Sequence, residues 1–464
     1  MIRNIMLSAC MAMCVGVHAD AQSLVGSWKG VLEVGGAGQL PLVFHVENDN
    51  TVTMDSPEQG AIGIKSKTNV LSADSINVEL SELGAQYVGK LCNDEIKGTF
   101  SQMGYSFPLN LKRGDVKLNR PQMPLPPFEY KTEEVEFCND GVDPQTGKKS
   151  EAGGARLSGT LVYPQNFKKG MPVMLMVTGS GQQNRDEELM GHKPFLVIAD
   201  YLAKHGIATL RYDDRGVGKS DGDYSKATTY DNMLDAQAGV RFLKNMKQFG
   251  KVGVLGHSEG GEIAYMLASR GEADFVVSLA GPVLSGDSLL IRQNKDILAM
   301  SGLDKEYVDK YALAMNRMID YVKKGQKSRF STPESIVASL TLGINMPEQL
   351  KDNLAEALKM IDNPWMRYFV SYNPAGDVNS MKCPAFLLFG EKDMQVSASM
   401  NVPVAKSLIP QKWQAKSEVK EYKGLNHLFQ PADSGLPMEY GKIETTISDQ
   451  VLEDIAAWIG GVTK

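Results

Sequence analysis

The sequence is poor in cysteine and has no excess of positive charge. Only five of its 464 residues are cysteine, and no two of them stand in a Cys-x-x-Cys spacing. Lysine and arginine number 49 against 55 aspartate and glutamate residues, which gives a formal net charge of −6. A nucleic acid or an anionic membrane would favour a basic partner surface. We therefore expect neither a nucleic acid nor a charged lipid surface as the partner.

Long hydrophobic runs are also missing after the amino-terminal segment. No later stretch approaches the roughly 18 apolar residues needed to cross a bilayer, so we expect no integral membrane segment in the mature chain. Hydrophobic residues make up 42% and charged residues 22% of the chain, which is ordinary for a globular protein. This composition excludes global disorder, collagen and a coiled coil.

The first residues have the features of an export signal. Arg3 is followed by a nearly continuous apolar run from Ile5 to Val17, and Ala19-Asp20-Ala21 fits a small-x-small cleavage site. We interpret residues 1–21 as a secretory signal peptide and expect a periplasmic or extracellular protein. The stretch Leu7-Ser8-Ala9-Cys10 also resembles a bacterial lipobox, so lipoprotein anchoring at Cys10 stays as an alternative.

The mature chain would keep three of the five cysteines. Cys10 and Cys14 lie in the signal peptide, which leaves Cys92, Cys138 and Cys383. An odd number without a spacing pattern implies no disulfide framework, although export would permit one. A single bridge such as Cys92–Cys138 stays open.

Residues 22–115 are predicted to form an antiparallel β-domain. Apolar residues alternate with period two, as in Leu40, Leu42, Phe44 and Val46, and turn-forming clusters separate such stretches. Short alternating strands with frequent turns are typical of a small barrel or sandwich. We find no catalytic constellation in this region.

Two aromatic residues of the β-domain allow two interpretations. Trp28 and Tyr105 could line a ligand-binding face, but we favour packing in the core for both.

A proline-rich stretch separates this region from the rest of the chain. Four of the seven residues in 121–127 are proline, which favours a stiff and extended backbone. We interpret residues 116–130 as a linker and place the domain boundary there.

Residues 131–464 are predicted to form an α/β domain. Apolar strands alternate with amphipathic helices, which indicates a doubly wound, mainly parallel sheet with helices on both faces. Residues 283–375 interrupt this alternation with helical segments, and we interpret them as a cap inserted over the carboxyl edge of the sheet. The expected strands are 156–163, 172–178, 207–212, 251–255, 275–279, 384–389 and 418–422, and the expected helices are 194–205, 230–247, 259–270, 399–408 and 443–458.

The pattern Gly-x-Ser-x-Gly occurs twice. Gly256–Gly260 follows an apolar strand and precedes a helical stretch, so Ser258 would sit on a sharp strand-to-helix turn with its hydroxyl exposed. Gly218–Gly222 stands in a polar loop without that context. We predict Ser258 as a nucleophile and Ser220 as a turn residue.

A nucleophilic serine needs a general base and an acid that orients it. Among the six histidines, His427 follows the last expected strand and would reach the same sheet edge as Ser258. Asp393 follows the preceding strand, which gives the order serine, aspartate, histidine. Glu391 and Asp287 are the rival acids, and we favour Asp393.

The negative charge that develops on the substrate oxygen needs backbone N–H donors. We predict the N–H of Glu259, at the start of a helix, and the N–H of Ser180, in the glycine-rich turn Thr178-Gly179-Ser180-Gly181. Gly181 and Gln182 are the next candidates for the second donor. The run Asn184-Arg185-Asp186-Glu187 would fix this loop by an internal ion pair or form a solvated charge cluster.

These residues resemble the α/β-hydrolase superfamily over about residues 130–464. The specific signs are Gly256–Gly260, the loop Asp213–Ser220 after a strand, and Gly390-Glu391-Lys392-Asp393. The sequence is most similar to bacterial esterases with an amino-terminal β-domain and a helical cap, and to serine aminopeptidase-like hydrolases. Their oxyanion loop resembles Gly179-Ser180-Gly181 followed by Arg185-Asp186-Glu187.

The resemblance implies roles for three residues, with Ser258 as nucleophile, Asp393 as acid and His427 as base. One departure is Thr178, because many relatives have histidine before the glycine, and it affects the detail of the oxyanion loop. We therefore expect an exported serine hydrolase that cleaves a small-molecule carboxylic ester without a metal or organic cofactor. The alternatives are a serine peptidase, a thioesterase, an acyltransferase, or a non-catalytic protein that binds a glycan or lipid.

Overall fold

The computed structural model describes residues 24–34, 38–72, 74–300, 302–325, 332–361 and 363–464. The chain divides into two compact units, residues 1–117 and 118–464. The predicted signal peptide and Cys10 lie outside the described residues. Each unit has its own hydrophobic core, so each is described by itself.

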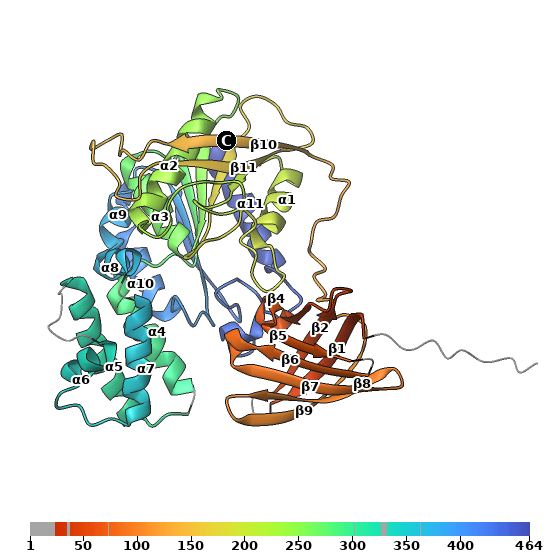
Figure 1. The fold of residues 1–464 in the computed structure, drawn as a ribbon. Helices are drawn as coiled ribbons and strands as arrows, with labels where there is room; N and C mark the ends of the chain where they lie inside the picture. Colours follow the sequence, from red (N-terminus) through yellow and green to blue (C-terminus); the bar gives the residue numbers. More distant parts are fainter. Residues whose placement is uncertain (1–23, 35–37, 73, 301, 326–331, 362) are drawn as a thin grey trace, which may run out of the picture. The chain divides into compact units, whose positions relative to one another are not determined.

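The smaller unit is a single antiparallel sheet of nine strands, which curves into an open barrel (Figure 1). The spatial order is β4-β3-β2-β1-β9-β8-β7-β6-β5, so pairing of the first strand with the ninth joins the two halves. This confirms the predicted antiparallel β-fold. The strands are β1 (Gly26–Glu33), β2 (Gln39–Val46), β3 (Val52–Ser56), β4 (Ala61–Lys65), β5 (Thr68–Leu71), β6 (Ser75–Leu80), β7 (Ala85–Cys92), β8 (Glu95–Gln102) and β9 (Tyr105–Arg113).

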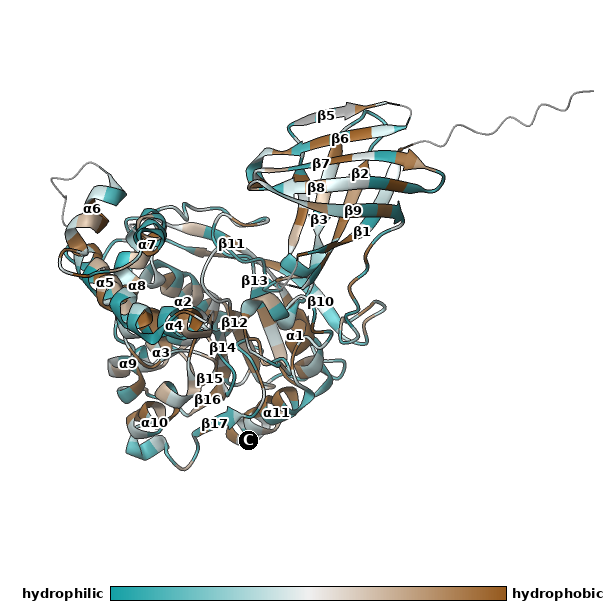
Figure 2. Cartoon of the chain, turned by 90° about the horizontal axis from the view of Figure 1, so that it is seen from below, coloured by the Kyte–Doolittle hydropathy of each residue, from teal (hydrophilic) through white to brown (hydrophobic). Residues whose placement is uncertain are grey.

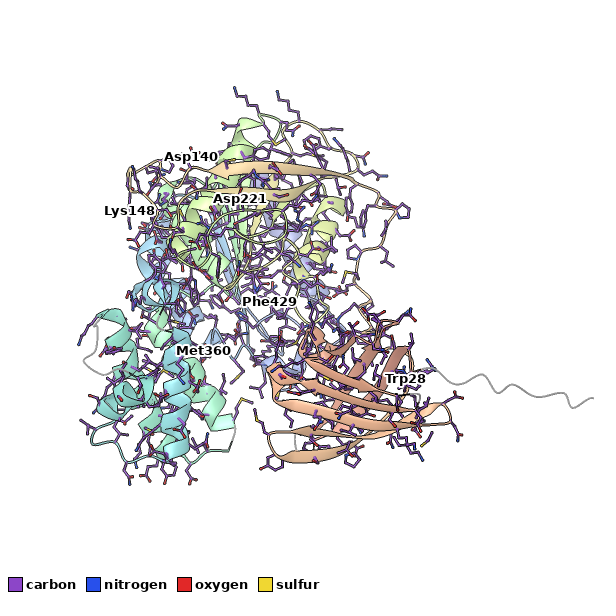
Figure 3. All side chains as sticks on the ribbon, viewed as in Figure 1. Trp28, Asp140, Lys148, Asp221, Met360 and Phe429 are labelled. Carbon is purple, nitrogen blue, oxygen red and sulfur yellow. The ribbon has the colours of Figure 1, made fainter. Side chains whose placement is uncertain are left out.

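Trp28, labelled in Figure 3, lies in the core of this sheet. Its indole is fully buried, its Nε1 donates to the Leu24 carbonyl at 2.6 Å, and the Arg113 guanidinium lies 4.3 Å from the ring centroid. Core packing is thus confirmed for Trp28. The same prediction is wrong for Tyr105, which is 71% exposed because it begins β9 directly after a turn.

The proline-rich segment is not a free linker, because its first part is bound to the larger unit. The Arg120 guanidinium donates to the carbonyls of Met190, Gly441 and Ile443 at 2.9, 2.8 and 3.1 Å. The Gln122 side chain donates to the Ile447 carbonyl at 2.8 Å. These polar contacts fix the backbone after residue 118, so part of the predicted linker 116–130 is bound within the larger unit.

The larger unit is built on an eight-stranded sheet in the order β10-β11-β13-β12-β14-β15-β16-β17. The last six strands of this order are parallel, and β11 pairs antiparallel with both of its neighbours. The central strands are buried on both faces and appear brown in Figure 2, as expected for a covered parallel sheet. The strands are β10 (Lys131–Asn139), β11 (Ala155–Tyr163), β12 (Val173–Val177), β13 (Ala208–Tyr212), β14 (Val252–His257), β15 (Phe275–Leu279), β16 (Ala385–Gly390) and β17 (Glu418–Tyr422).

Helices cover both faces of this sheet, which confirms the predicted doubly wound fold. One face packs against α1 and α11, and the other packs against α2, α3, α9 and α10 (Figure 1). The helices are α1 (Pro194–Lys204), α2 (Thr229–Asn245), α3 (Glu259–Arg270), α9 (Ala375–Asn379), α10 (Ala398–Leu408) and α11 (Asp449–Thr463).

Two elements of this unit differ from the sequence-based expectation. Strand β10 was not predicted, because Val135 and Phe137 are its only large apolar residues. The residues around them are mostly charged or polar. The final helix begins at Asp449 rather than at residue 443. The backbone before it is held by side chains, since the N–H groups of Thr446 and Ile447 donate to Gln122 Oε1 at 2.8 and 3.1 Å.

The chain between β15 and β16 is helical, as expected for residues 283–375. Its helices α4, α5, α6, α7 and α8 pack around a core of their own that includes Met315, Met318 and Leu354. Met360, labelled in Figure 3, lies on the outer face of α7. The bounds are α4 (Gly286–Met300), α5 (Lys305–Lys323), α6 (Pro333–Leu340), α7 (Glu348–Ile361) and α8 (Pro364–Ser371).

The three cysteines expected in the mature chain are free thiols. Cys92 and Cys138 are exposed and belong to different units, so the bridge left open between them is absent. Cys383 is buried, and burial raises the pKa of its thiol to about 12. Across the described residues, no helix combines the length and apolar character that a membrane crossing requires.

Candidate active site

Ser258 lies between the end of β14 and the start of α3, at the carboxyl edge of the sheet. Its backbone has φ +52° and ψ −116°, a strained region for a residue with a side chain. The Ser258 N–H donates to the Leu279 carbonyl at 2.8 Å, which anchors the turn to β15. The strand–turn–helix context that distinguished this serine in the sequence is therefore present in the structure.

The glycines of this pentapeptide are required by close backbone contacts. A Cβ added to Gly256 would lie 1.9 Å from the Gly260 carbonyl oxygen, and one added to Gly260 would lie 2.1 Å from the Val177 carbonyl oxygen. Both obstacles are backbone atoms, which cannot move aside as a side chain can. The sharp turn at Ser258 thus needs glycine two residues before and two residues after it.

Ser220, the serine of the second pentapeptide, is a buried structural residue. Its Oγ donates to the Asp213 carbonyl at 2.7 Å and accepts from the Ser158 N–H at 2.9 Å. The hydroxyl therefore joins the end of β13 to β11. Neither of these two partners is a histidine that could act as a base.

His427 and Asp393 are in direct contact. His427 Nδ1 lies 2.7 Å from Asp393 Oδ2, and both side chains are almost fully buried. The other carboxylate oxygen, Oδ1, accepts from the N–H groups of Gln395 and Val396, each at 2.8 Å. Because the carboxylate accepts all of these bonds, it favours the His427 tautomer that carries its proton on Nδ1.

The two rival acids are engaged elsewhere. Glu391 Oε2 accepts from the Gly424 N–H at 2.8 Å. Asp287 lies at the start of α4, where its carboxylate pairs with Lys323 and accepts from the Ser285 hydroxyl at 2.5 Å. Of the three acids considered, the structure brings only Asp393 to His427.

The two predicted oxyanion donors lie in different settings. Glu259 is the first residue of α3, where helix N–H groups lack intrahelical acceptors. Ser180 is an exposed loop residue after β12. Its neighbour Gly179 borders the turn, since a Cβ on Gly179 would lie 3.4 Å from the Ser258 Cβ. The N–H of Gly179 is itself occupied, because it donates to Glu187 Oε1 at 2.7 Å.

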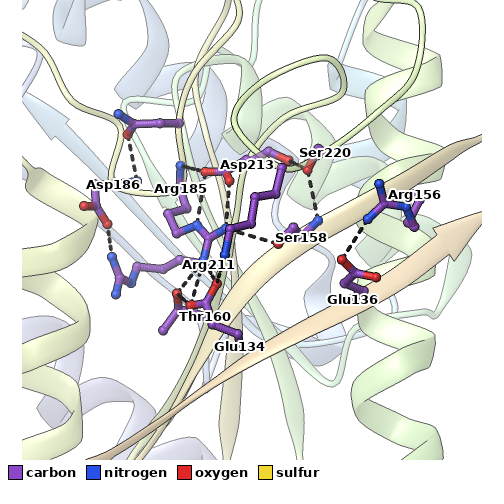
Figure 4. A network of polar contacts seen from close by, with 12 residues as sticks. Glu134, Glu136, Arg156, Ser158, Thr160, Arg185, Asp186, Arg211, Asp213 and Ser220 are labelled. Atoms are coloured by element: carbon purple, nitrogen blue, oxygen red, sulfur yellow. Dashed lines mark hydrogen bonds and ion pairs between the residues drawn. The ribbon is translucent and has the colours of Figure 1, made fainter.

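Charged side chains fix the loop that follows β12 (Figure 4). Arg185 pairs with Asp213 at 2.7 Å and with Glu134 at 2.9 Å, and Asp186 pairs with Arg211. The hydrogen bonds from Arg185 outweigh burial and lower the pKa of Asp213. Each ion pair joins the loop to another strand or loop, so the expected pairing inside 184–187 is not formed.

His257, the residue before Ser258, contacts both Glu187 and His427. Its Nδ1 lies 2.9 Å from Glu187 Oε1, and its Nε2 lies 3.1 Å from the His427 carbonyl oxygen. The His257 and His427 rings also pack together, with centroids 4.7 Å apart. Adjacency to Ser258 is the only signal in the sequence that points to His257.

Two buried carboxyl groups at the start of α3 were also missed. Glu259 Oε1 accepts from Trp365 Nε1 of α8 at 2.9 Å, which places the cap helix beside the turn. Glu262 is 1% exposed, and neither of its carboxyl oxygens has a hydrogen-bond partner among the described residues. Burial raises the pKa of both carboxyl groups, and repulsion from the Glu259 carboxylate raises the pKa of Glu262 further.

The sheet order, the turn at Ser258 and a family match together decide the fold family. The family described as serine aminopeptidase, S33, matches residues 193–335, which include the turn and much of the cap. The larger unit has the α/β-hydrolase fold. This confirms the predicted superfamily and the prediction of a hydrolytic enzyme.

Individual relatives are similar to this α/β hydrolase at low identity. Esterase EstD of Thermotoga maritima is 24% identical over 363 residues, which cover 76% of this chain and 79% of the relative. The esterase Pf2001 of Pyrococcus furiosus has 18% identity and a TM-score of 0.42, covering 75% of this chain and all of its own. A proline iminopeptidase of Mycobacterium smegmatis has 14% identity and a TM-score of 0.41, covering 67% of this chain and 96% of its own.

Proposed function

We propose that the protein is an exported serine esterase that cleaves small carboxylic esters through an acyl-serine intermediate. The observation that carries the proposal is the buried pair His427–Asp393, with a 2.7 Å contact, because the His427 carbonyl oxygen lies 3.1 Å from Nε2 of His257, the residue before Ser258. The name of the relative from Thermotoga maritima supports an ester substrate in preference to other acyl compounds.

In the proposed reaction, Ser258 Oγ attacks the ester carbonyl carbon while His427 Nε2 accepts the hydroxyl proton. Asp393 stabilises the positive imidazolium and is not itself protonated. The N–H groups of Glu259 and of Ser180 stabilise the negative oxygen of the tetrahedral intermediate. When the carbon–oxygen bond breaks, His427 gives its proton to the departing alkoxide, and the acyl group stays on Ser258.

The second half of the reaction regenerates the enzyme. A water molecule replaces the alcohol, and His427 Nε2 accepts its proton as the oxygen attacks the acyl carbon. Collapse of this second tetrahedral intermediate breaks the bond to Ser258 Oγ, which recovers the proton from His427. The products are one alcohol and one carboxylic acid, and the chain's own groups suffice for each proton transfer.

The direct test is hydrolysis of p-nitrophenyl acetate by the mature chain and by Ser258→Ala. The proposal predicts that the wild-type protein turns the ester over and that the variant does not exceed the background rate. Undiminished hydrolysis by the variant would contradict the proposal. The melting temperature of both proteins serves as the control that the substitution leaves the fold intact.

Export is tested separately from chemistry. The proposal predicts that the full-length precursor, expressed in a Gram-negative host, accumulates in the periplasm or medium with an amino terminus at Gln22. A lipidated amino terminus at Cys10 would support membrane anchoring instead, and an intact Met1 in the cytoplasm would contradict export.

The second candidate is a peptidase whose substrate carries a free amino group. Such an amine would need acidic groups, and Glu259 and the unpartnered Glu262 both lie in the first turn of α3, which follows Ser258. A bound ammonium group would stabilise the ionised form of these buried carboxyls. Comparison of kcat/KM for aminoacyl p-nitroanilides with that for short acyl esters separates the two candidates, and the esterase proposal predicts a preference for the esters.

A further inference from the structure

A buried ion pair lies where three loops of the hydrolase unit meet. Glu187 and His257 have side chains that are 7% and 9% exposed, and their contact is 2.9 Å long. The same Glu187 oxygen, Oε1, also accepts the Gly179 N–H at 2.7 Å. One carboxylate oxygen thus binds the loop after β12 and the residue that precedes Ser258.

The other side of the His257 ring contacts the histidine loop. His257 Nε2 lies 3.1 Å from the carbonyl oxygen of His427, and a carbonyl oxygen can only accept a hydrogen bond. Nε2 must therefore carry a proton. Burial disfavours a charged His257, but the Glu187 carboxylate outweighs this and raises the pKa of His257. Because Glu187 Oε1 and the His427 carbonyl oxygen are both acceptors, the two ring nitrogens donate to Glu187 and to His427 at the same time.

His427 is consequently held at two points. Asp393 binds the Nδ1 of its ring, and His257 binds the carbonyl oxygen of its backbone. Glu187 reaches this position with a φ of +52°, a conformation that a residue with a side chain adopts only when its surroundings stabilise it. The contacts run without a break from Gly179 through Glu187 and His257 to His427.

We propose that His257 and Glu187 are positioning residues of the proposed esterase, which fix the backbone of His427 and the loop after β12 relative to Ser258. The inference rests on the proposed function, because it assigns these residues to the same reaction. They act through His427 and Gly179 and do not touch the substrate. Their effect is on the geometry of the transition state, where a displacement of about 1 Å can lower the rate about 10²-fold.

A neutral side chain at position 187 cannot preserve all three hydrogen bonds. In Glu187→Gln, a neutral His257 carries one proton. If the proton is on Nδ1, the bond from Nε2 to the His427 carbonyl is lost. If the proton is on Nε2, Nδ1 becomes an acceptor, so the glutamine must turn its amide nitrogen toward His257. The Gly179 N–H then loses the oxygen that accepted its hydrogen bond. Either arrangement releases one of the two loops.

The experiment measures kcat per active site in Glu187→Gln and in His257→Gln. Active sites are counted by complete labelling with a fluorophosphonate, so protein that fails to fold is not counted. We expect kcat to fall about tenfold to a hundredfold in each variant, with KM changed less than threefold, because the lost contacts act in the transition state. The double variant should be no slower than the slower single variant, because both changes break one chain of contacts.

Glu188→Gln is the matched control. Glu188 is the exposed neighbour of Glu187 and pairs with Lys193 at 3.3 Å, so its change removes the same charge from the same loop. Its kcat per site should stay within about twofold of wild type.

The result that would overturn the inference is distinct from the one that overturns the proposed function. Wild-type kcat per site in both Glu187→Gln and His257→Gln, or an equal loss in Glu188→Gln, would remove the positioning role while Ser258→Ala remained inactive. Failure of both variants to give any labelled, folded protein would also overturn it, since the pair would then support the fold and not the reaction. Activity retained in Ser258→Ala would instead contradict the esterase itself.

Discussion

The chain contains the pattern Gly-x-Ser-x-Gly twice, and the two copies have different backbone conformations and different contacts. At Gly256–Gly260 the glycines meet backbone atoms, and the serine adopts a φ of +52°. At Gly218–Gly222 the glycines themselves have positive φ, and the Ser220 hydroxyl is bound between Asp213 and Ser158. One region holds a strained serine at the sheet edge, and the other uses a serine to close a loop.

The difference shows where the chemical information of such a motif lies. The pattern itself specifies only small residues around a hydroxyl. The strand before Ser258 and the helix after it create the tight turn, and β16 and β17 deliver Asp393 and His427 to the same edge. Ser220, which has glycines at the same two positions but lies in a polar loop, contacts Asp213 and Ser158 instead.

The largest expected effect separates the two serines. Ser258→Ala should lower kcat for p-nitrophenyl acetate by on the order of 10⁴-fold or more, since the acyl intermediate can no longer form. Ser220→Ala should keep kcat per labelled site within about twofold. It should lose about 1–3 kcal/mol of stability, because the buried Ser158 N–H loses its acceptor. Steady-state kinetics and thermal melting of both variants check the pair.

The next effect concerns Asp393, the acid that we propose for Ser258. Asp393→Asn should lower kcat about 10³–10⁴-fold, because an amide can donate to His427 Nδ1 and favour the wrong tautomer. Glu391→Gln and Asp287→Asn serve as controls and should stay near the wild-type rate. A loss of similar size in either control would show that the acid has been assigned to the wrong strand.

A third test compares the glycines of the two regions by stability. Gly256→Ala should lower the free energy of unfolding by at least about 3 kcal/mol, since its Cβ would lie 1.9 Å from a backbone oxygen. Gly218→Ala should cost about 1–2 kcal/mol, because its φ is +56° and the nearest atom belongs to the Asp213 side chain. Denaturant unfolding gives both values.

Gly460→Ala is the control for this comparison. Gly460 lies inside α11, and an added Cβ would meet no atom within 4 Å. Alanine should therefore stabilise the helix by about 0.5–1 kcal/mol. Equal costs at positions 256 and 218 would mean that the first turn is not specially constrained.

The smallest expected effect is on stability as a function of pH, and it distinguishes His257, beside Ser258, from His192 in the same unit. Burial and the Arg120 cation lower the pKa of His192 to about 4, below the unfolded value of about 6.5. Protons then favour the unfolded state, so the stability tied to His192 is lost as pH falls from 6.5 toward 4. The pKa of His257 is raised, so its contribution is present below pH 6.5 and lost as pH rises through that raised pKa.

Melting temperatures across pH 4–9 check these opposite signs. His192→Gln should flatten the decline on the acid side, and His257→Gln should flatten the decline on the alkaline side. If the two variants changed the same side of the profile, the charge states assigned to the two histidines would be wrong.

Much of the fold could be predicted because periodicity and turn chemistry are local. Strands such as 275–279 and helices such as 259–270 coincide with the observed elements. Strand β10 was missed because charged residues interrupt its apolar positions, and its pairing partner β11 comes only later in the chain. The docking of Arg120 and Gln122 depends on carbonyls more than 300 residues away, which no local pattern reveals.

The residues of the candidate site also fall into two groups, those that a local sequence pattern indicates and those that it does not. The contact between Asp393 and His427 could be predicted because each residue follows a strand that ends at the sheet edge. The partnership of Glu187 with His257 was not found, because it joins residues 70 positions apart through side chains that no motif links. The buried carboxyl of Glu262 likewise looks in the sequence like an ordinary helix-surface residue.

Trapping the acyl-enzyme intermediate would show which serine carries the acyl group. The mature protein is mixed with p-nitrophenyl acetate, quenched in acid within the first turnovers, digested and mapped by mass spectrometry. We expect an acetyl group on the peptide that contains Ser258 and none on the peptide that contains Ser220. Acetylation of Ser220, or burst release of p-nitrophenol without any acetyl-serine, would contradict it.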